Sequence, residues 1–281
     1  MHVSRPQFGC TTFQLSAQDG TIVIGRAMDY PQGPGFNMNS QILTYNRGEA
    51  CSTLAPDGNP GLEWTSNYGF IGTNAFGLDC IDDGLNQAGL SFAILTLPET
   101  TYQSVSSNED KIALPISQLG KWALGNFSTC KEFESALKTV KVWGDKIAQI
   151  NQVPLVHIAV SDSTGENLVV EFLKGKAKIH KNPVGVLTNE PKFEDHINQL
   201  KFFNGLSSQP APSTTINGHV ITSFLETGLD GMPGGLSSPA RFVQAATHVR
   251  LMTKPQAEID AVTIAVRLLG RLDVIPGMVN A

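Results

Sequence analysis

The stretch CTTFQLSAQDGTIVIGRAMD, residues 10–29, decides the fold. Two β-prone runs flank a polar turn at Asp19-Gly20, and an Asp-Gly pair between such runs is a strong hairpin signal. We therefore expect two antiparallel strands joined by a tight turn. This hairpin places Cys10 at the start of its first strand and folds Arg26 and Asp29 back toward it.

A thiol beside a cation and an acid is a candidate nucleophile. The guanidinium of Arg26 favours a thiolate at Cys10, and the carboxylate of Asp29 can hold an adjacent amine by a hydrogen bond. The spacing alone has little specificity, because arginine and aspartate three positions apart are common. The other cysteines, Cys51, Cys80 and Cys130, form no C-x-x-C pair. For any single cysteine a buried apolar role is the more frequent one.

The composition is that of a globular protein. The chain has 281 residues, of which 41% are hydrophobic and 16% charged, and its formal net charge is -5. That charge makes nucleic acid an improbable partner. No apolar run is long enough for a membrane span. Residues 1–9 are too short and too polar for a secretory signal, so we expect a cytoplasmic protein, with a periplasmic or secreted location as the open alternative.

The remaining sequence alternates between blocks of strands and blocks of helices. Residues 40–97 carry further β-like runs, residues 112–141 change to helical spacing, and residues 154–189 return to strand alternation. Thr129 and Glu132 form a capping box between two expected helices. The last third is mainly helical. This order predicts a single α+β domain in which helices cover antiparallel sheet.

Five ordered blocks carry a family resemblance. They are CTTFQL with GRAMDY, YGFIGTNAFG, DGLNQAGL, NPVGVLTNEPKF and GMPGGLSSPARF. Together they resemble the choloylglycine hydrolase family, which contains conjugated bile salt hydrolases and penicillin V acylases. The resemblance implies the N-terminal nucleophile hydrolase fold, an αββα sandwich of two sheets between helical layers.

The resemblance also implies a site and a maturation step. Cys10 matches the nucleophile, Arg26 and Asp29 match the active-site pair after it, Asn189 matches the asparagine near the oxyanion site, and Arg241 matches the last active-site arginine. Residues 1–9 would be a leader that is removed by self-cleavage, with a host protease as the alternative, leaving one domain over residues 10–281. Cleavage matters because a free α-amino group, with a pKa of about 8, can act as base, whereas an acylated nitrogen cannot.

The chain departs from the family pattern in three places. Thr96 stands where bile salt hydrolases carry asparagine and penicillin acylases often an aromatic residue. Gly235 replaces an acidic residue. Family members continue with strands beyond Ala281, so we expect a sandwich that lacks its usual C-terminal strands, whether as a fragment, a truncated product or a divergent member.

The expected substrate is a small linear amide. We expect its acyl chain in an apolar pocket that includes Phe13, Phe70 and Phe76, with Thr96 as a further contact. The acyl group could belong to a bile salt, penicillin V or an acyl homoserine lactone, and the missing asparagine favours the last two. No cofactor or metal is expected. Relatives suggest a possible homotetramer.

Two other interpretations remain open at the level of sequence. The chain could be a catalytically silent or truncated member of the fold that acts as a binding protein. Alternatively, a cysteine peptidase would need a histidine such as His157 or His180 beside Cys10, although a strand histidine more often has a structural role.

Overall fold

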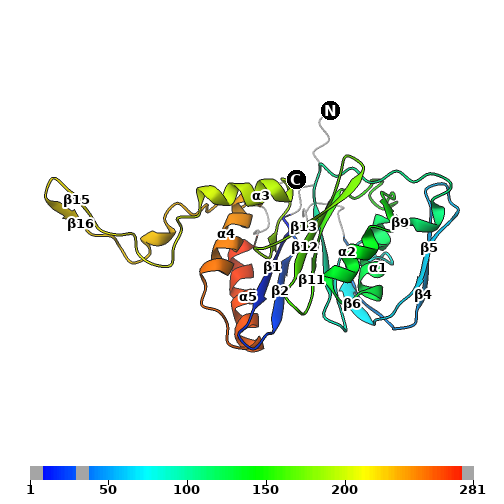
Figure 1. The fold of residues 1–281 in the computed structure, drawn as a ribbon, viewed down its shortest axis with the longest axis horizontal. Coiled ribbons are helices and arrows are strands. Elements are labelled where there is room, and N and C mark those ends of the chain that lie inside the picture. Colours follow the sequence, from blue (N-terminus) through cyan, green and yellow to red (C-terminus); the bar gives the residue numbers. More distant parts are fainter. Residues whose placement is uncertain (1–8, 30–37, 274–281) are drawn as a thin grey trace.

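Four layers of secondary structure build the computed structural model, which describes residues 9–29 and 38–273. A three-stranded sheet and a seven-stranded sheet lie face to face, and helices cover the outer side of each (Figure 1). This arrangement confirms the expected α+β class and the αββα layering.

The predicted hairpin forms the centre of the smaller sheet. Strand β1 (Thr11–Ser16) pairs antiparallel with β2 (Ile22–Ala27), and Thr12 lies opposite Arg26. Gly20 takes a φ of 92° in the turn, a conformation that glycine adopts without strain. On its other edge β1 pairs with β14 (Val186–Leu187).

The larger sheet is antiparallel throughout, in the order β13-β12-β11-β8-β7-β6-β3. Its strands are β3 (Ile42–Tyr45), β6 (Phe70–Thr73), β7 (Asp83–Asn86), β8 (Ser91–Thr96), β11 (Val156–Ser161), β12 (Asn167–Leu173) and β13 (Lys176–Lys181).

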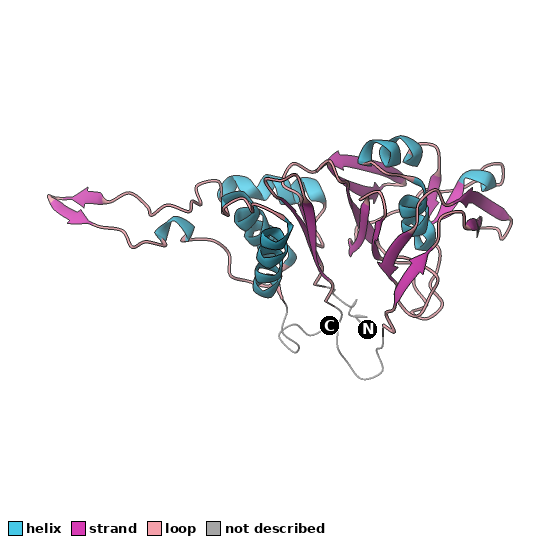
Figure 2. Cartoon of the chain, turned by 90° about the horizontal axis from the view of Figure 1, so that it is seen from below, coloured by secondary structure: helices cyan, strands magenta, loops and turns pink. Residues whose placement is uncertain are grey.

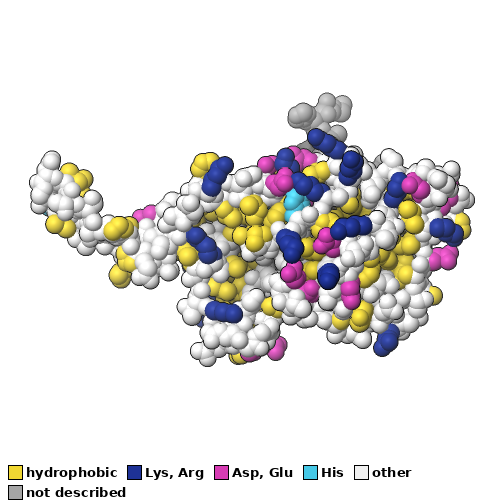
Figure 3. Space-filling view, in the orientation of Figure 1, with side chains coloured by type: hydrophobic (Ala, Val, Ile, Leu, Met, Phe, Trp, Pro, Cys, Tyr) yellow, Lys and Arg dark blue, Asp and Glu magenta, His cyan; other side chains and the backbone are white. Residues whose placement is uncertain are grey.

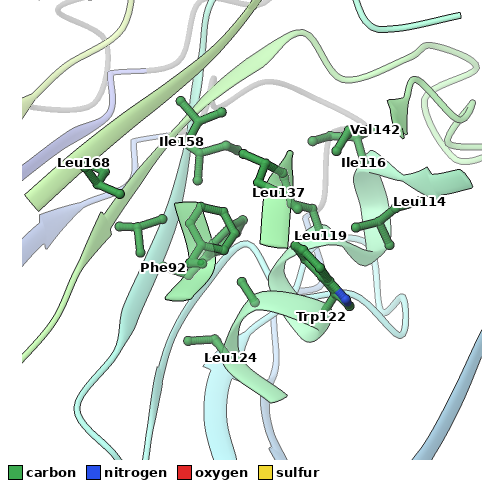
Figure 4. Close-up of a cluster of buried hydrophobic side chains, with 14 of the residues drawn as sticks. Phe92, Leu114, Ile116, Leu119, Trp122, Leu124, Leu137, Val142, Ile158 and Leu168 are labelled. Atoms are coloured by element: carbon green, nitrogen blue, oxygen red, sulfur yellow. The ribbon is translucent and has the colours of Figure 1, made fainter. Parts of the chain in front are cut away.

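Residues alternate between the two faces of this sheet. On β8, Phe92 packs in the cluster beneath the outer helices, whereas Ala93 and Leu95 pack in the cluster that contains Cys10. The helix-side cluster also holds Trp122 and is drawn in Figure 4. One face of the larger sheet is thus a purely structural core, and the other faces the hairpin.

Two helices cover that structural core. They are α1 (Leu119–Asn126) and α2 (Cys130–Leu137). The capping box of Thr129 and Glu132 is present at the start of α2, as predicted. The helical spacing expected from residue 112 is wrong at its beginning, where β9 (Ala113–Pro115) pairs in parallel with β10 (Lys141–Trp143).

The outer side of the small sheet is covered by α4 (Ser238–Leu251) and α5 (Glu258–Leu272), with α3 (Phe193–Gln199) beside α4. A separate hairpin of β4 (Ala50–Leu54) and β5 (Pro60–Thr65) lies at the far end of the molecule (Figure 1).

An arm, residues 207–236, extends away from the body between α3 and α4 (Figures 1 and 2). It ends in a small hairpin of β15 (Thr214–Ile216) and β16 (His219–Ile221). Only its last residues, from Gly231, belong to a block that carries the family resemblance. The leader expected at residues 1–9 lies outside the described residues except for Gly9. Within the described ranges, no helix is both long and apolar enough to cross a bilayer.

Candidate active site

Cys10 directly precedes β1 and lies between the two sheets, with only 4% of its surface exposed. Its main-chain N–H donates a hydrogen bond of 2.8 Å to Asn189 Oδ1. The nitrogen that cleavage would turn into an α-amine is therefore already held by a side chain predicted for the site.

Asn189 follows β14, the strand that borders β1. Its Oδ1 accepts from Cys10 N and, at 3.0 Å, from Arg241 Nη2. Its Nδ2 donates to the carbonyl of Thr96 at 3.4 Å, near the upper limit for a hydrogen bond. Because Oδ1 already accepts two hydrogen bonds, Nδ2 is the atom of this amide that can donate to a further acceptor.

Arg241 lies in the first turns of α4 and joins three parts of the site. Its Nη1 donates to the carbonyl oxygen of Cys10 and to Thr11 Oγ1, both at 2.7 Å. Its Nε donates to the Leu236 carbonyl at 2.9 Å. Burial lowers the pKa of Arg241, and the nearby Cys10 and Asp29 oppose that shift.

Arg26 leaves β2 and crosses to the larger sheet. Its Nε donates to Asp83 Oδ1 at 2.7 Å, and its Nη2 donates to the Ile94 carbonyl at 2.8 Å. A third bond runs from Nη1 to the Ala27 carbonyl. Burial acts to lower the pKa of Arg26, but the charges and hydrogen bonds of Asp83 and Cys10 outweigh burial and raise it. The guanidinium stays charged beside the thiol.

Asp29 completes the predicted group. Its carbonyl accepts the N–H of Gly9 at 3.0 Å, which brings the residue before Cys10 against the end of β2. Burial raises the pKa of the Asp29 carboxyl, while Arg241 and Arg26 act to lower it. Its Oδ2 is buried without a hydrogen-bond partner in the described part of the chain.

A thiol, two guanidinium groups, a carboxylate and an amide thus meet between the sheets. Residues 10–281 match the model of the linear amide C–N hydrolases, choloylglycine hydrolase family. The chain belongs to the choloylglycine hydrolase family. Like the other members it is a hydrolase of carbon–nitrogen bonds in linear amides.

Individual relatives agree with this family. A bile salt hydrolase/transferase of Clostridium perfringens is 30% identical over 240 residues, which cover 84% of this chain and 70% of the relative. A penicillin V acylase of Pectobacterium atrosepticum is 28% identical over 67% of this chain and 47% of its own length. A crystal structure of a conjugated bile acid hydrolase variant from Clostridium perfringens has a TM-score of 0.80 at 28% identity, covering 95% of this chain and 80% of that one.

The four residues that sequence reasoning placed around Cys10 are all in its neighbourhood. Arg241 and Asn189 contact it by hydrogen bonds, and Arg26 interacts with its thiol. Asp29 lies close enough to both guanidinium groups for their charges to act on its carboxyl.

The structure corrects one residue of the expected acyl pocket, Phe70. Its ring stacks on Tyr45 at 4.6 Å and packs in the helix-side cluster, on the opposite face of the larger sheet from Cys10. The physical reason is strand parity, because alternate residues point to opposite faces. Phe70 is a core residue and does not line the site.

The other expected substrate contacts have different positions. Phe13 is buried in the same cluster as Cys10, with its ring against Gly25. Phe76 lies in the loop after β6, where its N–H bonds to the Met38 carbonyl. The main-chain carbonyl of Thr96 accepts a hydrogen bond from Asn189. Ala93 and Leu95 on the same strand point toward Cys10, so the Thr96 side chain points to the opposite, helix-side face.

Sequence reasoning missed a row of buried polar groups behind the site. His196 Nε2 lies 2.9 Å from the Asn189 carbonyl, and His157 Nε2 lies 2.7 Å from the Thr188 carbonyl. Glu171 faces His157 at 3.5 Å, and its pKa is lowered to about 2 because the nearby histidines and a hydrogen bond from the backbone N–H of Phe193 outweigh its burial. The sequence did carry a signal for this group, because Glu171 interrupts the otherwise apolar strand pattern VVEF.

Asp83 was also missed, although it belongs to the block DGLN that carried the resemblance. Burial raises the pKa of Asp83 to about 6, and Arg26 opposes this shift. The neighbouring Asp82 has its pKa raised to about 7, by burial first and then by the charge of Asp83.

No imidazole in residues 9–29 or 38–273 hydrogen-bonds to the Cys10 sulfur. His157 is directed at Thr188 and Glu171, and His180 also faces Glu171, at 3.2 Å. The peptidase interpretation therefore has no geometric support. Within the same ranges, no cluster of three His, Cys, Asp or Glu side chains could hold a metal.

Proposed function

We propose that the mature enzyme begins at Cys10 and uses its thiolate to cleave the amide bond of a small N-acyl substrate. The convergence of Cys10 N and Arg241 on Asn189 Oδ1 supports this proposal most directly. It holds the future amine, the nucleophile and the oxyanion donor in one rigid arrangement between the sheets. Such preorganisation is the usual source of rate enhancement in acyl transfer.

In the proposed reaction the α-amine of Cys10 takes the thiol proton, and the sulfur forms a bond to the amide carbonyl carbon. The negative charge moves to the former carbonyl oxygen, where Asn189 Nδ2 and backbone N–H groups stabilise it by about 3 to 4 kcal/mol per well-placed donor. The carbon–nitrogen bond then breaks, and the amine leaves with the proton. Water hydrolyses the thioester and restores Cys10.

Each remaining charged group has a distinct task in this proposal. Arg26 stabilises the thiolate, and Arg241 fixes the Cys10 carbonyl and the Asn189 amide. Asp29 holds the new α-ammonium, which would give its buried Oδ2 a partner.

Maturation by loss of residues 1–9 belongs to the same proposal. The family match begins at Cys10, and Gly9 allows the unusual backbone conformations that self-cleavage needs. As long as Gly9 acylates Cys10, the nitrogen cannot accept the thiol proton. The buried thiol beside Gly9 is the nucleophile that we propose for the autocatalytic step.

The substrate class is an amide with an apolar acyl group. The names of the relatives cover bile salts and penicillin V, and the chain carries neither an asparagine nor an aromatic residue at Thr96. We therefore put penicillin V and acyl homoserine lactones ahead of bile salts. Phe13 and Phe76 remain the aromatic candidates for acyl contact.

The test combines intact mass with a substrate panel. Wild type is expected to lack residues 1–9 and to hydrolyse penicillin V or a long-chain acyl homoserine lactone faster than glycocholate. Cys10→Ala should keep the full mass and turn over none of the three. A stable full-length wild type without turnover would instead support the silent binding protein.

Assembly through the arm is a further part of the proposal. The arm exposes apolar side chains, among them Phe224 at 83% and Leu225 at 78%, and Figure 3 shows such side chains along it. Large exposed apolar groups on a projecting arm are typical of an interface. We propose that the arm packs on another copy of the chain in a homotetramer.

Light scattering on the purified protein tests this assembly. Wild type should have the mass of four chains, and the double substitution Phe224→Asp with Leu225→Asp should lower it. A monomeric wild type at micromolar concentration would contradict the proposal. The cytoplasmic location is likewise a proposal, and fractionation of the native cell tests it.

A further inference from the structure

Asp83 connects the two sheets at the nucleophile. Arg26 belongs to β2 of the small sheet, and Asp83 belongs to β7 of the large one. Their ion pair of 2.7 Å is mostly shielded, with side chains 14% and 16% exposed. The second Asp83 oxygen is buried without a hydrogen-bond partner in the described ranges, so its charge is directed largely at this one cation.

The contacts of Arg26 leave it little freedom. A guanidinium has five N–H groups in one plane. Asp83 takes Nε–H and the Ile94 carbonyl takes one N–H of Nη2, which fixes the plane against β7 and β8. The Cys10 thiol is a further hydrogen-bonding neighbour of the same group. The orientation set by Asp83 therefore decides where positive charge meets the sulfur.

We propose that Asp83 is a positioning residue for the nucleophile: it aligns the Arg26 guanidinium on Cys10 and limits the positive charge that the sulfur experiences. This inference rests on the proposed role of Cys10. It assigns to Asp83 a part in the reaction, not only in holding the sheets together. Asp83 itself does not touch the reacting atoms.

Two opposite effects follow from this arrangement. A carboxylate behind the guanidinium offsets part of its field, so removing the carboxylate stabilises the thiolate and makes it a weaker nucleophile. Moving the carboxylate displaces the guanidinium and leaves the total charge unchanged. The other charged groups near Arg26 are Asp29, Asp82 and Arg241, and they stay in place in both cases.

Three substitutions separate these effects. Asp83→Asn keeps the shape and an acceptor for Arg26 Nε but removes the charge. Asp83→Glu keeps the charge but moves it by one methylene. Asp82→Asn is the matched control, because this neighbouring carboxyl is also buried but accepts a hydrogen bond from Cys80 Sγ, at 3.9 Å, and none from Arg26 within the described part of the chain.

The readouts are the pH dependence of Cys10 alkylation by iodoacetamide, followed by peptide mass so that Cys51 is counted separately, and kcat with KM. Samples are compared at the same processing state, established by intact mass. Asp83→Asn should shift half-maximal alkylation to lower pH by about 0.5 unit or more. Its kcat should fall roughly tenfold with KM changed less than about twofold.

Asp83→Glu should shift half-maximal alkylation to higher pH, because the displaced guanidinium stabilises the thiolate less, and should lose roughly tenfold in kcat. Asp82→Asn should match wild type in both. Unchanged kcat and alkylation in Asp83→Asn would overturn the inference, as would equal shifts in Asp82→Asn. If Asp83→Asn does not fold, a wild-type kcat in Asp83→Glu overturns it. Alkylation needs no substrate, so a shift without amide turnover by wild type would refute the proposed function and retain the role of Asp83.

Discussion

The main-chain nitrogen of Cys10 lies 2.8 Å from Asn189 Oδ1, although 179 positions separate the two residues. In the proposed mechanism this one amide side chain fixes Cys10 through Oδ1 and offers Nδ2 to the oxyanion. This division of labour makes Asn189 the most informative residue to change.

Asn189→Ala should lower kcat by about 100- to 1000-fold, because the oxyanion loses its side-chain donor. Steady-state hydrolysis of the best substrate from the panel measures this loss. Asn182→Ala is the matched control, since Asn182 is also buried but its side chain bonds to Val186, Val184 and Gly185. That control should lower stability and leave kcat close to wild type, and equal losses in both variants would contradict the role of Asn189.

Asp82→Asn should stabilise the fold in a pH-dependent way. Burial raises the pKa of Asp82 from 3.8 to about 7. The folded state therefore binds more protons than the unfolded state between these values, and wild-type stability falls as pH rises through this range. The amide does not titrate, so the advantage of Asp82→Asn should be absent below about pH 4 and reach about 2 to 4 kcal/mol above about pH 8.

Urea unfolding at several pH values measures this difference. The exposed Asp230 offers a control, and Asp230→Asn should change the free energy of unfolding by less than about 0.5 kcal/mol at every pH. A constant advantage of Asp82→Asn across the whole range would show that packing, not ionisation, is responsible.

Phe70 and Phe76 should respond in opposite ways to truncation. Phe70→Ala opens a cavity in the helix-side cluster and should lower the free energy of unfolding by about 3 to 5 kcal/mol with little change in KM. Phe76→Ala should raise KM with a smaller loss of stability, because Phe76 is partly exposed in a loop. Thermal melts and substrate titrations check both, and a raised KM in Phe70→Ala would restore it to the acyl pocket.

The contrast between these two residues shows what sequence patterns can determine. Local signals predicted the hairpin of β1 and β2 and the capping box at Thr129, because turn chemistry and periodicity act over a few residues. The face on which Phe70 points depends on the parity of β6, which one residue of register reverses. The short strand β9 was mistaken for the beginning of a helix because Ile116, Leu119 and Trp122 recur at helical spacing directly after it.

The site residues show the same difference between local contacts, which the sequence predicts, and long-range contacts, which it does not. Cys10 and Arg26 come together through a local hairpin, which the sequence predicts directly. Arg241 contacts Cys10 across 231 positions, and only the family resemblance indicated it. Asp83 received no role, because its partner is set by how the two sheets face each other, and no local pattern encodes that.

Gly25→Ala should lower the free energy of unfolding by roughly 1 to 3 kcal/mol, because the added methyl group overpacks the hairpin. A Cβ at Gly25 would lie 2.1 Å from the ring of Phe13, so the ring would have to move. Phe13→Leu in the same chain should recover part of the loss, and melting curves of the single and double variants measure the recovery. No recovery would mean that the strain lies in the backbone and not in the ring contact.

Arg241→Lys should lower kcat by about 100-fold even though the charge is retained. A lysine ammonium is a compact point donor, whereas the planar fork of Arg241 spans the Cys10 carbonyl, Thr11 Oγ1 and Asn189 Oδ1 at once. With lysine at least one of these groups loses its donor, and Asn189 can rotate away from the reacting carbonyl. Arg250→Lys on the same helix is the matched control, because Arg250 donates to the Asn204 and Leu206 carbonyls and, within the described residues, not to Cys10 or Asn189. Its kcat should stay within about twofold of wild type, and a wild-type kcat in Arg241→Lys would mean that charge alone, without the fork, organises the site.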